Sequence, residues 1–346
     1  MDTKVEMIQA ETQKNESAMI SVRDLVVHYE MDDGVVEAVN GVSFDISKGE
    51  TLGLVGETGA GKTSIALSIT GLLSSPPANI LEGSIMFQGR DLLKMSHKEL
   101  RSIRGSKISM IFQDPMTALN PVQKVGDQIA EVIKLHNKGK NKKYVQLLAA
   151  DMLKTVGIQP ERYEDYPHQF SGGMKQRVVI AMALACNPEL IIADEPTTAL
   201  DVTIQAQILD LIKKLQKERN TSMLLITHDF GVVAEVCDKC AVIYAGEIVE
   251  YGTVAHIFNN PMHPYTIGLF DSLPSIDDET ERLKPIQGQV TDPMDLHPYC
   301  SFADRCDVCQ EKCREKDPVL IEAEPGHLVK CLKFEKEAAE DGAAGG

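Results

Sequence analysis

Consecutive residues from Gly56 to Thr63 have the types and spacing of a loop that binds phosphate groups. The pattern G-x-x-x-x-G-K-[S/T] is matched in full by Gly56, Glu57, Thr58, Gly59, Ala60, Gly61, Lys62 and Thr63. Glycines let the backbone turn its N–H groups toward phosphate oxygens, at a helix start that adds positive potential. The Lys62 ammonium can reach the β- and γ-phosphates of a nucleotide, and the Thr63 hydroxyl can ligate Mg²⁺.

Two adjacent carboxylates, Asp194 and Glu195, follow an apolar run at residues 190–193. An apolar strand that ends in an acid delivers Asp194 to the carboxyl edge of a parallel sheet, where it can help to hold Mg²⁺. Glu195 can polarise an attacking water. Alone, the pattern is equally typical of an ordinary strand with an acidic exit. Its combination with the phosphate loop favours the catalytic interpretation.

The hydrophobic periodicity predicts the elements that position these groups. Strands are expected at residues 20–30, 35–46, 51–55, 189–194 and 223–229, with a hairpin around Ala245 and Gly246. Helices are expected at 64–73, 127–136, 145–157 and 206–219. This alternation indicates an α/β fold with a helical insertion at about 115–180.

Composition divides the chain into three parts. Residues 1–19 form a polar leader of mixed charge, and 20–260 carry the strand and helix pattern. Residues 261–346 form an extension rich in Pro, His and Asp that contains a cysteine cluster and ends in a flexible tail.

The overall charge and hydropathy exclude several classes of partner. The chain has 346 residues, with 51 acidic and 35 basic side chains and a net charge of −16. A surface this acidic repels phosphate backbones, so nucleic acid is not expected as a partner. No apolar run reaches the roughly 18 residues of a membrane span, and the leader lacks the apolar centre of a secretory signal. The chain is therefore expected in the cytosol, with any membrane role exerted through protein partners.

Residues 170–177, FSGGMKQR, resemble the LSGGQ-type signature of ATP-binding-cassette (ABC) ATPases. The resemblance departs at two positions, where Phe170 replaces Leu and Met174 replaces the final Gln. Further motifs follow in the order of the family: Tyr29 as the aromatic that stacks on adenine, Gln113 in FQDP as the Q-loop glutamine, Ala199-Leu200-Asp201 as the D-loop and His228 in ITHD as the switch histidine.

This resemblance implies an ABC-type P-loop ATPase core with a mixed, RecA-like sheet, a helical subdomain and a small Cys-rich C-terminal extension. Glu195, His228 and Gln113 would be catalytic, and Thr63, Gln113 and Asp194 would order Mg²⁺. Ser171, Gly172 and Gly173 would meet the γ-phosphate of ATP bound to the opposite subunit. The chain would therefore pair with a second ABC ATPase, identical or homologous.

Three segments narrow the resemblance to ATPases of oligopeptide and dipeptide importers, with nickel importers as close relatives. They are QDPMTALNPV at 113–122, FSGGMKQRV at 170–178 and HPYTIGLFDSLP at 263–274. The resemblance implies peptide import through two integral-membrane permeases, fed by an extracytoplasmic solute-binding protein, with the ATPase peripheral on the cytoplasmic face. Alternatives are import of nickel or another small solute, a soluble ABC ATPase, and an exporter.

Five of the eight cysteines lie between residues 300 and 331. In importer ATPases of this group a C-terminal Cys-x5-Cys-x6-Cys-…-Cys pattern resembles a [4Fe–4S] site, and Cys300, Cys306, Cys313 and Cys331 match it. Cys309 is additional. Because Cys306 and Cys309 have knuckle spacing, Zn²⁺ is the alternative, and free thiols are a third. Cys186, Cys237 and Cys240 are interpreted as ordinary structural residues.

Overall fold

The computed structural model describes residues 18–137, 139–198, 200–272 and 284–335. Most of the predicted leader, Ala199 of the D-loop and the tail after residue 335 lie outside these ranges.

An eight-stranded mixed sheet forms the centre of the molecule, in the order β11-β12-β10-β9-β3-β8-β7-β6. The five strands from β9 to β6 are parallel, and the other three continue the sheet in antiparallel pairing. Their bounds are β3 Thr51–Val55, β6 Ile108–Ile111, β7 Leu190–Asp194, β8 Ser222–Thr227, β9 Lys239–Tyr244, β10 Glu247–Thr253, β11 Ile321–Glu324 and β12 His327–Val329. Every residue of β3, β7 and β8 is buried, which explains why these strands are apolar runs without alternation. The predicted α/β fold with a mixed sheet is confirmed.

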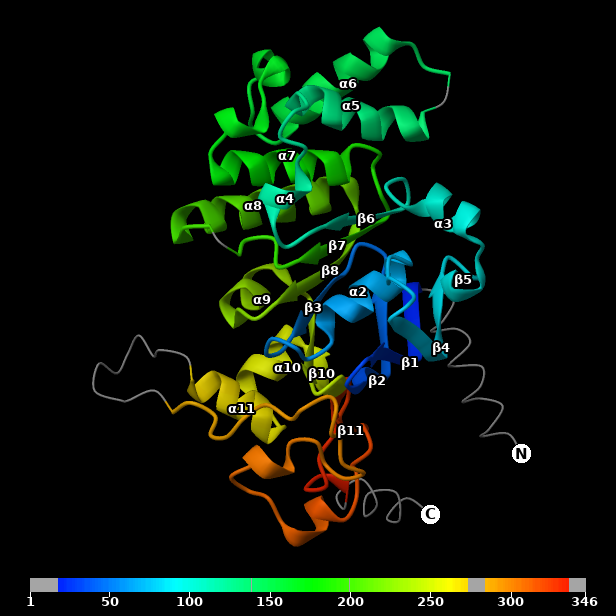
Figure 1. Ribbon diagram of the computed structural model, residues 1–346. Coiled ribbons are helices and arrows are strands. Elements are labelled where there is room, and N and C mark those ends of the chain that lie inside the picture. Colours follow the sequence, from blue (N-terminus) through cyan, green and yellow to red (C-terminus); the bar gives the residue numbers. More distant parts are fainter. Residues whose placement is uncertain (1–17, 138, 199, 273–283, 336–346) are drawn as a thin grey trace, which may run out of the picture.

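A second, antiparallel sheet packs beside the first in the order β2-β1-β4-β5 (Figure 1). Its strands are β1 Ala18–Met31, β2 Gly34–Ser47, β4 Ala78–Phe87 and β5 Arg90–Asp91. The helix α2, Lys62–Thr70, contributes Ile65, Ala66 and Ile69 to the apolar core that both sheets share.

The α2 helix ends earlier than the sequence pattern predicts. We expected a helix through Leu73, but Gly71 adopts a left-handed conformation with φ of 61° and caps the helix with its backbone N–H. Glycine takes this conformation without a steric penalty and so terminates helices. The apolar spacing continued past the glycine and concealed the end.

The segment in which the sequence predicts a helical insertion forms a layer of helices at the top of Figure 1. It contains α4 Pro115–Ala118, α5 Val125–His136, α6 Lys142–Thr155, η2 Pro160–Glu164, η3 Pro167–Gln169 and α7 Gly172–Leu184. Its apolar faces form one cluster with α8, Val202–Arg219, and with strands β6, β7 and β8 of the large sheet. Among the described residues before 260, the remaining helices are η1 Leu92–Lys94, α3 His97–Ile103, α9 Phe230–Val236 and α10 Val254–Asn259.

The C-terminal extension returns to the large sheet. It begins with α11, Pro264–Asp271, continues through η4, Ala303–Arg305, and η5, Glu311–Arg314, and ends in β11 and β12. Strand β12 pairs with β10, where the buried Glu250 carboxylate accepts the backbone N–H groups of Met262 and His263 and contacts His327 Nε2 at 2.8 Å. Among the described helices, none is long and apolar enough to cross a bilayer. The division at residue 260 stays a prediction.

Candidate nucleotide site

The phosphate loop connects the end of β3 to the first turn of α2. Two of its glycines are required by close backbone approaches. A Cβ at Gly61, whose φ is 93°, would lie 2.1 Å from the Ala38 carbonyl oxygen, and one at Gly56 would lie 2.2 Å from that of Ile243. Larger residues at these positions would displace the loop from the sheet.

The Lys62 ammonium lies inside this loop, where it donates to the carbonyl oxygens of Gly56 at 2.7 Å and Glu57 at 2.8 Å. Burial lowers the pKa of Lys62, although Glu195, Asp194 and Glu57 act in the opposite direction. Among the described residues, the hydrogen-bond partners of Lys62 are neutral carbonyls, so a triphosphate would supply an anionic partner for this buried cation.

Thr63 and Asp194 come together although 131 residues separate them in the chain. The Thr63 hydroxyl donates to Asp194 Oδ2 at 3.0 Å. Asp194 is the last residue of β7 and is buried, and this burial raises the pKa of its carboxyl. A hydroxyl and a carboxylate are oxygen donors of the kind that Mg²⁺ prefers, so the residues fit the cation implied by the resemblance.

Glu195 is held by three side chains from three different segments. Its Oε2 accepts from the Gln113 amide at 2.8 Å and from the Thr198 hydroxyl at 3.0 Å, and its Oε1 lies 3.3 Å from His228 Nδ1. Its φ is 46°, a left-handed value that is uncommon for a residue other than glycine and is concentrated at functional positions. The structure thus brings together the predicted catalytic residues.

Tyr29 lies on β1, beside the phosphate loop. Its hydroxyl hydrogen-bonds the hydroxyl of Ser64, the residue after Thr63, at 2.9 Å. This contact places the ring near the first turn of α2. Stacking of the ring on adenine stays a prediction.

The signature and D-loop residues occupy helix N-termini. Ser171 caps α7, with Gly172 and Gly173 in the first turn, and Asp201 caps α8 by accepting from the Ile204 N–H at 3.0 Å. A Cβ at Gly173 would lie 2.5 Å from Ile204 Cγ2, so the two helix starts are tightly packed. No hydrogen bond among the described residues joins 171–173 to the phosphate loop, and the structure does not bring these two motifs together.

Three residues that contact the site were missed by the sequence analysis: Thr198, Tyr265 and Arg305. Thr198 follows Glu195 by three residues, and a hydroxyl in that turn is a local signal that could have been used. The Tyr265 hydroxyl accepts the Glu57 N–H at 3.0 Å, and Arg305 pairs with the Glu57 carboxylate. Both belong to the C-terminal extension, and no local spacing indicates their contact.

Four of the five clustered cysteines line one cavity of about 210 Å³: Cys300, Cys306, Cys313 and Cys331. Burial raises the pKa of Cys300 to about 12, and the neighbouring cysteines of this set act in the same direction. Cys309 is not part of the lining, and its thiol faces the Gln310 carbonyl oxygen. Within the described ranges, no three His, Cys, Asp or Glu residues are grouped at the spacing of a metal-ion site.

A phosphate loop before α2, an acid at the end of a parallel strand and a helical insertion that carries the signature define an ATPase of the ATP-binding-cassette class. Comparisons with known proteins support this class. Residues 39–198 match the family described as ABC transporter, and residues 249–313 match the family described as Oligopeptide/dipeptide transporter, C-terminal region. The fold is similar to a dimeric post-hydrolysis structure of the ATP-binding cassette MJ0796 bound to ADP and Pi, with TM-score 0.62 and 27% identity over 68% of this chain and 99% of that chain.

Two curated proteins of Bacillus subtilis (strain 168) are similar over nearly the whole chain. The oligopeptide transport ATP-binding protein AppD is 48% identical over 94% of this chain and 99% of its own length. The dipeptide transport ATP-binding protein DppD is 50% identical over 92% of this chain and 96% of its own length. The chain belongs to this family of peptide-transporter ATP-binding proteins.

Proposed function

We propose that this chain hydrolyses ATP to power the import of di- or oligopeptides through a membrane permease pair. The assignment of peptides as the transported substrate rests on one observation, the similarity to AppD and DppD over more than nine tenths of the chain. The match of residues 249–313 to the transporter C-terminal family supports it independently of the ATPase core. Nickel import is the second candidate, and the sequence resemblance to nickel importers is its only support.

The proposed reaction is transfer of the γ-phosphoryl group of ATP to water. The water oxygen bonds to the γ-phosphorus, the bond to the β–γ bridging oxygen breaks, and Glu195 accepts the proton that the water loses. Lys62 and His228 stabilise the negative charge on the phosphoryl oxygens, and the Gln113 amide orients the water and Glu195. Thr63, Asp194 and Gln113 would hold Mg²⁺, which neutralises phosphate charge when bound.

Hydrolysis is proposed to need two ATPase subunits arranged head to tail. The separation of residues 171–173 from the phosphate loop of the same chain supports this, since the signature would otherwise contact no nucleotide. In the dimer, Ser171, Gly172 and Gly173 of one copy meet the γ-phosphate held by the other, with Asp201 at the same interface. The similarity to a dimeric cassette structure is further support. The second subunit is either identical or homologous.

The membrane partners are proposed to be two integral-membrane permeases, with the ATPase peripheral on the cytoplasmic face and an extracytoplasmic solute-binding protein delivering cargo. A cavity of about 320 Å³ between the helical subdomain and the large sheet is proposed as the binding site for a permease helix, the permease seat. Its lining is mostly apolar and includes Phe112, which is 44% exposed, together with Met110, Val132 and Met182. Because Gln113 follows Phe112, a helix bound here would act on Glu195.

The C-terminal cysteines are proposed to hold a [4Fe–4S] cluster, with Zn²⁺ as the alternative. The shared cavity of Cys300, Cys306, Cys313 and Cys331 supplies the four thiolates that a cubane takes. Four thiolates around one zinc ion lie about 4 Å apart, given Zn–S bonds of about 2.3 Å. A cluster places its own iron and sulfide between the ligands and needs a wider arrangement. Because the described residues include no set grouped for a single metal ion, the cluster proposal rests on the sequence resemblance and on the shared cavity.

Two experiments test the transport proposal. An anaerobic pull-down of the tagged chain from detergent-solubilised native membranes should recover two multi-span permeases and a second ATPase. The recovered complex, reconstituted in vesicles, should then take up labelled di- or oligopeptides in an ATP-dependent manner. Uptake of Ni²⁺ and not of peptides would contradict the peptide assignment and show that the complex is a nickel importer. Recovery of soluble partners alone, while other transporters stay intact, would contradict an importer.

A further inference from the structure

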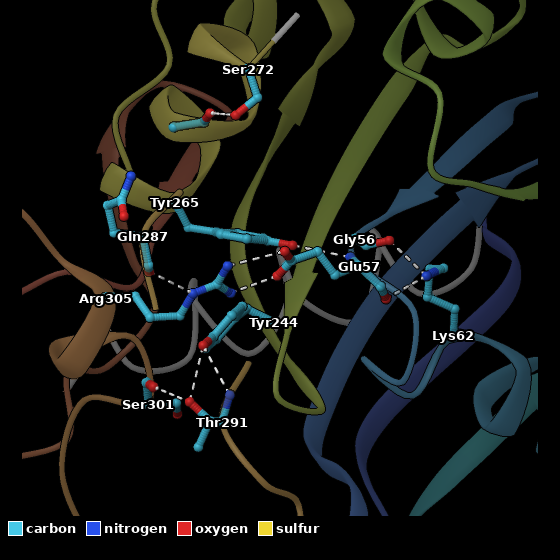
Figure 2. Close-up of polar contacts among 11 residues, drawn as sticks. Gly56, Glu57, Lys62, Tyr244, Tyr265, Ser272, Gln287, Thr291, Ser301 and Arg305 are labelled. Carbon is cyan, nitrogen blue, oxygen red and sulfur yellow. Dashed lines mark hydrogen bonds and ion pairs between the residues drawn. The ribbon is translucent and has the colours of Figure 1, made fainter. Parts of the chain in front are cut away.

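An arginine of the C-terminal extension, Arg305, forms an ion pair with the phosphate loop of the ATPase core. Arg305 Nη1 donates to Glu57 Oε2 at 2.7 Å, and Nη2 donates to Glu57 Oε1 at 3.1 Å. Figure 2 shows the two parallel contacts, with Lys62 on the other side of Glu57. The Arg305 side chain is 5% exposed and the Glu57 side chain is 29% exposed, so this is a partly buried, bidentate ion pair within the loop that binds phosphate.

The surroundings of Arg305 fix the direction of its guanidinium. The guanidinium lies over the Tyr244 ring, 5.7 Å from the centroid, and Nε donates to the Gln287 carbonyl oxygen. Tyr244 packs against Tyr265, whose hydroxyl accepts the Glu57 backbone N–H at 3.0 Å. The extension therefore holds both the side chain and the backbone of Glu57.

The charge of Glu57 explains how its contact with Arg305 affects nucleotide binding. A carboxylate in a phosphate loop repels a triphosphate, and Glu57 lies next to the Lys62 ammonium, which donates to the Glu57 carbonyl oxygen at 2.8 Å. The Arg305 guanidinium neutralises that carboxylate and, through its fork geometry, turns it away from the space in front of Lys62. Without the arginine, the loop would present an uncompensated negative charge to ATP.

We propose that Arg305 is a positioning residue for ATP binding, which acts through Glu57 to set the charge and conformation of the phosphate loop. The C-terminal extension is thus a structural part of the nucleotide site. This inference rests on the ATP-binding role of the loop, and it is independent of the transported cargo and of any cluster at the cysteines.

The test is a double-mutant cycle on the full chain, with Arg305→Met, Glu57→Gln and the double variant. The dissociation constant for ATP is measured by displacement of the fluorescent analogue TNP-ATP, and KM and kcat are measured separately. Arg305→Met should weaken ATP binding about tenfold and raise KM more than it lowers kcat, because it leaves the Glu57 charge unpaired. In the double variant most of this loss should be recovered, since the repelling charge is gone.

Arg314→Met is the matched control. Arg314 forms an ion pair with Asp304 in the same extension, but its side chain is 52% exposed and the pair does not touch the phosphate loop. This variant should bind ATP like the wild type. Unchanged ATP affinity in Arg305→Met, or losses in the two single variants that simply add in the double variant, would overturn the proposal.

A second comparison covers the case in which Arg305→Met does not fold. Arg305→Lys keeps the charge but loses the fork, and it should weaken ATP binding in the wild-type background and not in the Glu57→Gln background. Thermal unfolding of each variant, recorded without nucleotide, shows whether the protein is folded. Equal losses of ATP affinity in both backgrounds would mean that Arg305 serves stability alone, and the proposal would fail.

Discussion

The Gln113 side-chain amide and the Glu195 carboxylate are joined by a hydrogen bond of 2.8 Å across 82 residues of sequence. Gln113 lies between β6 and the helical subdomain, whereas Glu195 follows β7 at the centre of the nucleotide site. A movement of the helical subdomain therefore changes the constraints on Glu195. This bond is a direct structural link between the proposed permease seat and the proposed catalytic residue.

Glu195→Gln should bind ATP and yet lose hydrolysis. The amide keeps the size of the side chain but cannot take a proton from water, and loss of a general base costs about 10²–10⁴-fold in kcat. Phosphate release under saturating ATP measures the turnover, and size-exclusion chromatography with ATP should show accumulated dimers. Glu189→Gln is the control, because Glu189 precedes the same strand and pairs with Lys107 at its opposite end. Near-normal turnover of Glu195→Gln would show that Glu195 is not the general base.

Thr198→Val should lower kcat without changing the affinity for ATP. The Thr198 hydroxyl donates to Glu195 Oε2, whereas the valine keeps the shape and loses that donor. Since Thr198 orients the base and does not contact the reacting atoms, we expect a loss of about three- to tenfold. Thr198→Ser retains the hydroxyl and should restore most of the rate. A serine variant as slow as the valine variant would show that packing, not the hydrogen bond, is responsible.

The parts of the site that lie in short motifs could be predicted from sequence because a strand–loop–helix unit fixes their geometry. Lys62 and Thr63 follow a buried strand directly, and Asp194 ends another, so parallel pairing places them at one edge of the sheet. The end of α2 was predicted wrongly because apolar spacing outweighed the helix-terminating signal of Gly71. Separation of the signature from its own phosphate loop was implied only by the family resemblance.

The contact of Arg305 with Glu57 could not be predicted, because it depends on how the last part of the chain packs. The two residues are 248 positions apart, and neither periodicity nor charge spacing relates them. The bond forms because β12 joins β10 and the extension packs its aromatic residues, Tyr265 and Phe302, against Tyr244. Tertiary packing of this kind leaves no local sequence signal.

Asp194→Asn should stabilise the nucleotide-free protein while it impairs hydrolysis. Burial raises the pKa of Asp194 above its ordinary value of 3.8, so the Asp194 carboxyl group binds its proton more tightly in the folded state than in the unfolded state. The stability that the protonated acid contributes is present below the ordinary pKa and is lost as pH rises through the raised value.

Urea unfolding of wild type and Asp194→Asn, in a chelating buffer without Mg²⁺, measures this effect. The gain in unfolding free energy should be larger at about pH 8 than at about pH 4.5. A destabilised Asp194→Asn at both pH values would show that the carboxylate is favourably accommodated in the fold, contrary to the direction of its pKa.

Tyr29→Ala should weaken ATP binding, and Tyr29→Phe should not. Stacking of a base on an aromatic ring contributes about 1–3 kcal/mol, which is about 5- to 150-fold in affinity. The phenylalanine variant keeps the ring and loses only the hydrogen bond to Ser64. Competition with a guanine or a non-aromatic triphosphate analogue measures the contribution of the base. Equal affinities of the alanine and phenylalanine variants would show that Tyr29 does not stack on adenine.

Serine at the cavity-lining cysteines should abolish metal loading, whereas serine at Cys309 should not. Cys300→Ser and Cys331→Ser each remove one of the four thiols that line the shared cavity, and Cys309 lies outside that lining. Anaerobically prepared wild type and Cys309→Ser should be brown, with visible absorption and about four iron and four sulfide per chain, as a cubane requires. Cys300→Ser should lose both colour and iron. Colourless wild type that contains one zinc per chain would replace the cluster with the zinc alternative, and loss of metal in Cys309→Ser would place that residue among the ligands.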